Sequence, residues 1–175
     1  MKTAMRATSL DDKFILDATA GFRMMWFNKH HPNCIYVDRR IECEPDVVAD
    51  NSKLDYPDGS FKLIVWDPPQ IVEKGGTWSH GNSNMKRDFG YLQPDTFASE
   101  LRASFFELWR LLAPFGILNL KWSTKYRSTD EILKLFPVQP LFGQVSQNLD
   151  KATSQRNVRT VWFCFMKIPP QETPP

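Results

Sequence analysis

The tetrapeptide Asp67-Pro68-Pro69-Gln70 holds the residues of this chain that are best suited to chemistry. It follows the apolar run from Phe61 to Trp66, which is typical of a strand buried on both faces. Pro68 and Pro69 fix two φ angles and remove two backbone donors, so the Asp67 carboxylate and the Pro68 carbonyl can both face a cavity as acceptors. Such a site suits a ligand amine. An ordinary proline turn after a strand is the other interpretation.

Three earlier apolar runs also end in an aspartate. They are Phe14-Ile15-Leu16 before Asp17, Cys34-Ile35-Tyr36-Val37 before Asp38, and the run from Pro45 to Ala49 before Asp50. Each acid alone is typical of a surface or capping position. Their repetition predicts parallel strands whose carboxyl ends present acids at one edge of a sheet.

The residues after the first of these strands are small, Ala18-Thr19-Ala20-Gly21, and lead into the run from Phe22 to Phe27. This pattern predicts a strand, a tight loop and then a helix whose first N–H groups are free to meet a ligand. An acid at the end of the second strand lies beside that loop and can accept hydrogen bonds from two ribose hydroxyls. Asp38 therefore indicates a nucleoside site, with Asp50 near the base.

The second half of the chain alternates between the helical and the extended period. The fold class that this predicts is α/β: a Rossmann-like, doubly wound, mostly parallel sheet with an antiparallel terminal strand and helices on both faces. We expect a single domain over residues 1–167 with a lead-in at 1–13, and a disordered proline-rich tail at 168–175. The expected elements are a helix over 96–112, strands at 117–122, 140–142 and 158–166, and a helix from the capping box at Ser128 to Pro137.

Composition narrows the function without naming it. The chain has 175 residues and a formal charge of +2, which neither requires nor opposes a nucleic-acid partner. Its three cysteines lack the spacing of a disulfide framework or a zinc site, so we expect reduced thiols and a cytoplasmic location. We also expect no membrane span and no metal. A monomer or a weak homodimer is expected.

A long polar segment follows Gln70. It is rich in glycine and includes Trp78, Lys86, Arg87, Phe89 and Tyr91, a mixture suited to phosphate contact and base stacking. A loop that tucks its aromatic side chains onto the core is the alternative interpretation. His80 is interpreted as incidental rather than as a general base. A polar stretch at 143–157 predicts a second exposed loop.

Taken together, these motifs resemble the class I S-adenosylmethionine-dependent methyltransferases, over about Phe14 to about Lys167, and in detail the small enzymes of phages and prophages. The stretch from Ile15 to Gly21 is similar to the first motif of the family, although Thr19 and Arg23 stand where glycines are often found. The segments at 58–65 and 110–117 resemble its framing segments. Asp67-Pro68-Pro69-Gln70 resembles the Asp-Pro-Pro-aromatic motif of enzymes that methylate exocyclic amines, with Gln70 in place of the aromatic residue.

The resemblance implies that the protein transfers a methyl group to an exocyclic amine, adenine in DNA first, with S-adenosylmethionine as cofactor and nucleic acid as partner. RNA, a protein, a small molecule, or a module that only binds the cofactor remain alternatives. The implied sites are catalytic at Asp67, Pro68, Pro69 and Gln70; cofactor-binding at Asp17, Ala18, Thr19, Ala20, Gly21, Arg23, Asp38, Arg39, Asp50 and Asn51; and substrate-binding at Trp78, Lys86, Arg87, Phe89, Tyr91 and Lys121.

Overall fold

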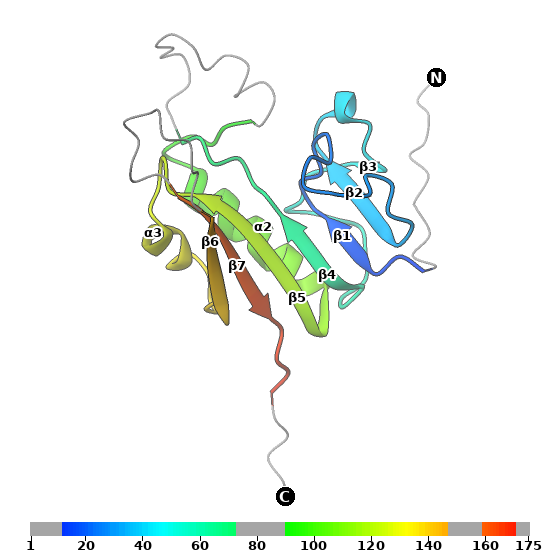
Figure 1. Ribbon diagram of the computed structural model, residues 1–175. Helices are drawn as coiled ribbons and strands as arrows, with labels where there is room; N and C mark the ends of the chain where they lie inside the picture. Colours follow the sequence, from blue (N-terminus) through cyan, green and yellow to red (C-terminus); the bar gives the residue numbers. More distant parts are fainter. Residues whose placement is uncertain (1–11, 73–89, 147–158, 171–175) are drawn as a thin grey trace, which may run out of the picture.

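A computed structural model describes residues 12–72, 90–146 and 159–170 as a twisted sheet with helices against it (Figure 1). The sheet has seven strands in the order β3-β2-β1-β4-β5-β7-β6. The elements are β1 (Ile15–Asp17), β2 (Cys34–Asp38), η1 (Ile41–Cys43), β3 (Val47–Val48), β4 (Phe61–Trp66), α2 (Phe97–Leu111), β5 (Leu112–Ser123), α3 (Thr129–Leu133), β6 (Phe142–Ser146) and β7 (Thr160–Met166).

The strand directions confirm the predicted fold class. The strands β3, β2, β1, β4 and β5 pair in parallel, whereas β7 is antiparallel to both β5 and β6. The chain runs outward from β1 to β2 and β3 and then crosses back to β4, so the strand order reverses between β1 and β4. In open α/β sheets, ligands bind outside the carboxyl ends of the strands at such a point.

One face of the sheet carries the main core. Trp66 of β4, Phe105 of α2 and Phe136 after α3 belong to one buried cluster, in which the rings of Phe105 and Phe136 stack with centroids 4.3 Å apart. The predicted capping box begins α3, since the Ser128 hydroxyl accepts from Glu131 N and the Glu131 carboxylate accepts from Ser128 N. Both described α-helices thus pack on the same face, whereas the prediction had placed helices on both faces. Neither of them is long and apolar enough to cross a membrane.

The helix predicted over Phe22 to Phe27 is wrong. The chain forms successive turns there, with Gly21 and Arg23 at positive φ angles of 49° and 56°. Left-handed residues interrupt a helix. The Trp26 ring instead packs edge-on against Tyr36 of β2 with centroids 5.3 Å apart. Within the described residues, a loop rather than a helix therefore covers this part of the second face.

Three strand boundaries also differ from the predictions. The strand β5 begins at Leu112 rather than at Ile117. The third strand was expected from Pro45 to Asp50, but only Val47–Val48 pair with β2. The edge strand β6 covers Phe142–Ser146 rather than Pro140 to Phe142, so it takes the beginning of the segment predicted to be a loop. The strands β3 and β6 lie at the ends of the sheet order, where a strand has a partner on only one side.

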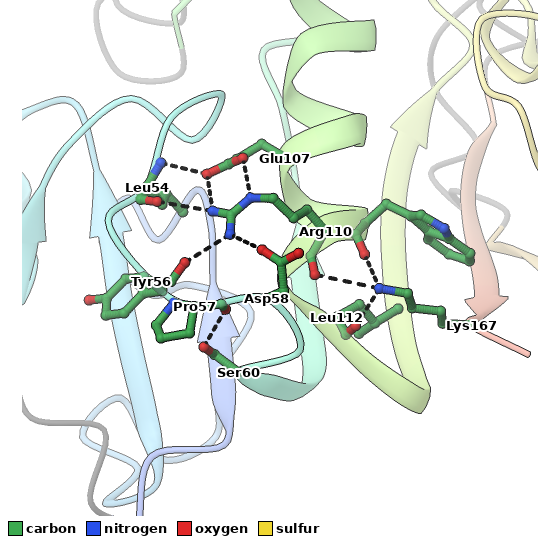
Figure 2. Close-up of polar contacts among 10 residues, drawn as sticks. Leu54, Tyr56, Pro57, Asp58, Ser60, Glu107, Arg110, Leu112 and Lys167 are labelled. Atoms are coloured by element: carbon green, nitrogen blue, oxygen red, sulfur yellow. Dashed lines mark hydrogen bonds and ion pairs between the residues drawn. The ribbon is translucent and has the colours of Figure 1, made fainter. Parts of the chain in front are cut away.

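Arg110 lies near the amino ends of β4 and β5, on the opposite side of the sheet from the carboxyl ends of the parallel strands. It joins the segments at 58–65 and 110–117 (Figure 2). Its guanidinium donates to the Glu107 carboxylate, to the Asp58 carboxylate, and to the carbonyls of Leu54 and Tyr56. Glu107 also accepts from Leu54 N at 2.8 Å. The loop before β4 is thereby fixed to the last turns of α2.

A lysine that follows β7 completes this region. Lys167 Nζ donates to the carbonyls of Trp109 and Leu112, both at 2.8 Å (Figure 2). Those carbonyls lie where α2 ends and β5 begins, so the last turn of the helix would otherwise leave acceptors unsatisfied. The positive charge of Lys167 also interacts favourably with the negative, C-terminal end of the α2 dipole.

We expect Arg110→Ala to lower the free energy of unfolding by about 2–4 kcal/mol, because it removes charged hydrogen bonds and leaves Glu107 without its cation. Urea unfolding monitored by circular dichroism measures this. Arg102→Ala is the matched control, since Arg102 is exposed on the same helix. An equal effect of both substitutions would show that the Arg110 network adds nothing beyond the loss of a helical arginine.

Candidate active site

A cavity of about 390 Å³ opens at the carboxyl ends of the parallel strands. The loops after β1, β2, β3 and β4 form one part of its wall, and α2 and the end of β5 form the other. Its lining residues are Ala18, Thr19, Asp38, Arg39, Arg40, Ala49, Asn51, Asp67, Pro68, Pro69, Gln70, Ile71, Gly90, Tyr91, Leu92, Glu100, Leu101, Ser104, Lys121, Ser123, Lys125 and Tyr126. The structure thus brings together Asp38 and Asp67, as the sequence predicted.

Asp38, at the end of β2, fixes the first loop. Its carboxylate accepts from Gly21 N at 2.7 Å and from Arg40 N at 2.9 Å, and forms an ion pair with the Arg40 side chain at 3.1 Å. Burial alone would raise the pKa of Asp38, but the bonds from Arg40 and Gly21 outweigh it and hold the pKa below its ordinary value. Asp38 is therefore an ionised acceptor at the cavity wall.

Asp17 lies behind the cavity rather than in its wall. The side chain is fully buried and accepts from Trp26 Nε1 at 2.6 Å and from Thr19 N at 3.1 Å. Burial raises its pKa to about 6, against these two bonds. Asp17 supports the first loop from beneath, and the prediction that it lines the pocket together with Asp38 and Asp67 is wrong.

The end of β3 places Asn51, rather than Asp50, at the cavity. Asn51 is buried, donates to Ala18 O and accepts from the Ser104 hydroxyl of α2 at 2.8 Å. Asp50 is exposed and bonds to Ser52 and to Arg39 at 2.8 Å. Arg23 also lies away from the cavity: its guanidinium donates to Glu44 O and covers the Tyr36 ring.

Asp67 is the centre of a polar network at the other end of the cavity. Its carboxylate accepts from Gln70 Nε2 at 2.6 Å and from Lys121 Nζ at 2.7 Å. Burial raises the pKa of Asp67, and the Lys121 cation and the Gln70 bond oppose that rise without cancelling it. Gln70 therefore has a polar role in place of the stacking role of an aromatic residue.

Thr19 connects the two ends of the site. Its hydroxyl accepts from Asp67 N at 2.7 Å, while Ala18 N of the same loop donates to Val65 O at 2.9 Å. At the position of Thr19, the first motif of the methyltransferase family that this stretch resembles often has a glycine. The side chain thus provides a direct contact between the first loop and the Asp-Pro-Pro segment that a glycine could not make.

The ends of the segment that follows Gln70 are fixed beside the cavity. Val72 pairs with Leu92, and Leu92 N donates to Ile71 O. Gly90 has a φ of +73°, and a Cβ there would lie 3.3 Å from Pro69 Cγ, so a larger residue would press on the motif. Tyr91 lines the cavity. The other predicted substrate residues of this segment, Trp78, Lys86, Arg87 and Phe89, lie outside the described residues.

The lining residues that the sequence analysis missed include Ser104, Lys125, Tyr126 and Arg40. Ser104 is polar within the apolar face of a helix, and this signal could have identified it. Lys125 and Tyr126 follow a strand in the same way as the predicted acids, but they carry no motif. Arg40 adjoins the predicted Arg39 and was missed because nothing in its spacing separates the two.

Comparison with known proteins identifies the fold. No family model matches the chain, and no curated protein matches it. The PH0226 protein of Pyrococcus horikoshii OT3 superposes with a TM-score of 0.55 at 13% identity, over 85% of this chain and 80% of its own. The 1,6-didemethyltoxoflavin-N1-methyltransferase of Burkholderia thailandensis, bound to S-adenosylhomocysteine, gives 0.54 at 14% identity, over 89% and 71%.

A geranyl diphosphate methyltransferase in complex with geranyl diphosphate and sinefungin gives a TM-score of 0.53 at 11% identity, over 91% of this chain and 75% of its own. The chain has the fold of S-adenosylmethionine-dependent methyltransferases. At these identities the likeness concerns the fold, and the function has to be argued from the site.

Proposed function

We propose that the protein is an S-adenosylmethionine-dependent methyltransferase that modifies an exocyclic amine of a nucleic-acid base, adenine in DNA first. One observation carries the proposal: Asp67 and Asp38 line the same cavity at the switch point of a methyltransferase fold. Asp38 suits a ribose, and Asp67 suits an amine. The structural neighbours named above support the cofactor assignment.

The lining residues fit the cofactor. Ala18 and Thr19 leave room for a ligand close to the backbone, Asp38 accepts from hydroxyls, and Asn51 lies at the end of the neighbouring strand. The Arg40 side chain, which now pairs with Asp38, has to share that carboxylate or turn away. When bound, S-adenosylmethionine supplies an activated methyl group.

The chain's own residues then act on the acceptor amine. A ring-bound amine is a poor nucleophile because its lone pair is delocalised. Asp67 and the Pro68 carbonyl accept its N–H groups while the nitrogen becomes pyramidal, and Asp67 lies in position to receive the proton that the methylated nitrogen releases. The remaining contribution is positioning.

A nucleic-acid partner is favoured by the residues around the cavity. Tyr91 and Tyr126 are aromatic lining residues, and Lys125, exposed beside Tyr126, supplies a cation for phosphate. A base inside a duplex would have to flip out to reach Asp67. We further propose action in the cytoplasm, because Cys34, Cys43 and Cys164 are buried and form no disulfide.

Methylation of RNA, a protein or a small molecule is the second candidate. It is favoured by Gln70, whose amide is bonded to Asp67 and to β5 and so offers no ring for stacking a base. The structural neighbour from Burkholderia thailandensis is a 1,6-didemethyltoxoflavin-N1-methyltransferase with the small molecule 1,6-didemethyltoxoflavin bound. Methyl transfer should therefore be measured with DNA, RNA, protein and small-molecule acceptors.

Two measurements test the proposal. We expect S-adenosylmethionine at 100 times its dissociation constant to stabilise the protein by about 2.7 kcal/mol in a thermal unfolding assay. We expect labelled methyl to pass to DNA rather than to RNA, protein extract or a metabolite pool. Cofactor binding without transfer to any pool would indicate a binding module, and the absence of binding would remove the enzyme assignment.

A further inference from the structure

We propose that Gln70 and Lys121 are positioning residues that fix the orientation and the negative charge of the Asp67 carboxylate. The catalytic consequence of this rests on the proposed function, whereas the effect on Asp67 does not. The two side chains bond to Asp67 from different elements, Gln70 from the segment after β4 and Lys121 from β5.

The Gln70 side chain continues the sheet where the backbone cannot. The ladder between β4 and β5 ends at the pair Trp66 and Leu120, and the prolines that follow lack N–H groups. Gln70 Nε2 donates to Lys121 O at 3.2 Å, and Gln70 Oε1 accepts from Ser123 N at 3.0 Å. A parallel neighbouring strand would bond to the same two groups on either side of Trp122.

This anchoring fixes the carboxylate as well. The second N–H of the Gln70 amide donates to Asp67 Oδ1 at 2.6 Å, so the amide uses both of its donors and its acceptor. The strand β5 thereby sets the place of Gln70, and Gln70 sets the place of one carboxylate oxygen. A phenylalanine at position 70 could make none of these bonds, and a tyrosine or tryptophan, with a single donor, could not make all three.

Lys121 acts on the other oxygen. Its Nζ lies 2.7 Å from Asp67 Oδ2, and the side chains of Lys121 and Asp67 are only 29% and 20% exposed. In the described residues, the charged group in contact with Asp67 is this cation, from β5, while the Asp17 carboxylate at the end of β1 is bonded to Trp26 and to Thr19 N behind the cavity. Burial disfavours a negative charge on Asp67, whereas the Lys121 cation and, after it, the bond from Gln70 favour it.

The charge matters for the proposed reaction. A carboxylate has about four lone-pair sites, and the bonds from Gln70 and Lys121 take two of them. The remaining sites can accept an N–H of the acceptor amine. A protonated Asp67 would carry an O–H that competes for the same space and could no longer receive a proton.

Carboxyl ¹³C NMR titration of the free protein tests the inference without any substrate. Asp67→Asn identifies the resonance. We expect Lys121→Met to raise the pKa of Asp67 by one unit or more, because an adjacent cation lowers a carboxyl pKa by about 1–3 units. Lys121→Arg should stay within about half a unit, and Gln70→Leu should raise the pKa by less than Lys121→Met does.

Lys134→Met is the matched control, since Lys134 pairs with Asp130 on the surface, and it should leave Asp67 unchanged. An unchanged pKa of Asp67 in Lys121→Met, and in Lys121→Gln if the first variant is unstable, would overturn the inference. If the pKa rises but no acceptor is methylated by the parent protein, the inference stands and the proposed function fails. Where transfer is detected, the acid limb of kcat/KM should move to higher pH in Lys121→Met.

Discussion

We expect Asp67→Ala to lower the rate of methyl transfer by about 10³-fold or more, while the affinity for S-adenosylmethionine stays within about threefold of the unaltered protein. The physical reason is that Asp67 is the carboxylate that lines the cavity on the Asp-Pro-Pro side, whereas Asp38 lines the side of the first loop. Loss of Asp67 removes the acceptor of the amine protons and leaves the ribose contact in place. Labelled methyl transfer and calorimetric titration with the cofactor measure the two quantities.

Asp67→Asn is the control for shape, because it keeps the volume and removes the charge. We expect it to lose most of the activity too, since an amide offers one acceptor oxygen and cannot receive the proton. The Lys121 cation is 29% exposed, so water can solvate it in both variants. A loss of cofactor affinity together with activity would mean that Asp67 belongs to the cofactor site rather than to the acceptor site.

The parallel strands and their acidic ends could be predicted because their signal is local. A short apolar run is typical of a strand buried on both faces, and β4 extends over Phe61–Trp66 as expected. The carboxyl ends of parallel strands meet at one edge of a sheet, so the position of Asp38 beside the first loop followed from the order of the runs. The hydrogen bond from Gly21 N to the Asp38 carboxylate confirms that Asp38 lies beside this loop.

The segment after Gly21 shows where local pattern fails. Phe22 to Phe27 has the composition of a helix, but Gly21 and Arg23 adopt positive φ angles, and Trp26 reaches back to Asp17. The buried contact of an indole with a carboxylate outweighs a helix propensity of a few tenths of a kcal/mol per residue. Tertiary packing decided this element, and no property of the six residues reveals it.

The role of Gln70 could not be predicted for a related reason. Its anchor, Ser123 N, lies 53 positions away in the sequence. A glutamine in place of an aromatic residue looks like the loss of a stacking group when the motif is considered alone. Once β5 is aligned with β4, the same glutamine extends the ladder beyond two prolines and orients the neighbouring carboxylate.

The second large effect is expected at Asp38. We predict that Asp38→Ala weakens the binding of S-adenosylmethionine by about 1.5–3 kcal/mol, the usual value for hydrogen bonds to a charged group. This equals about a 10–150-fold rise in the dissociation constant. Part of the loss comes from the loop, because Gly21 N and Arg40 lose their acceptor as well. Calorimetric titration measures the dissociation constant.

Asp50→Ala is the control for Asp38→Ala. It separates a direct contact of Asp38 with the cofactor from the general effect of removing an acid near the cofactor. Asp50 follows the neighbouring strand but is exposed and pairs with Arg39, so its removal should change the affinity by less than about threefold. An unchanged affinity in Asp38→Ala would exclude Asp38 from the cofactor site. Equal losses in both variants would instead indicate that the net charge of this edge, rather than a contact with ribose, attracts the cationic cofactor.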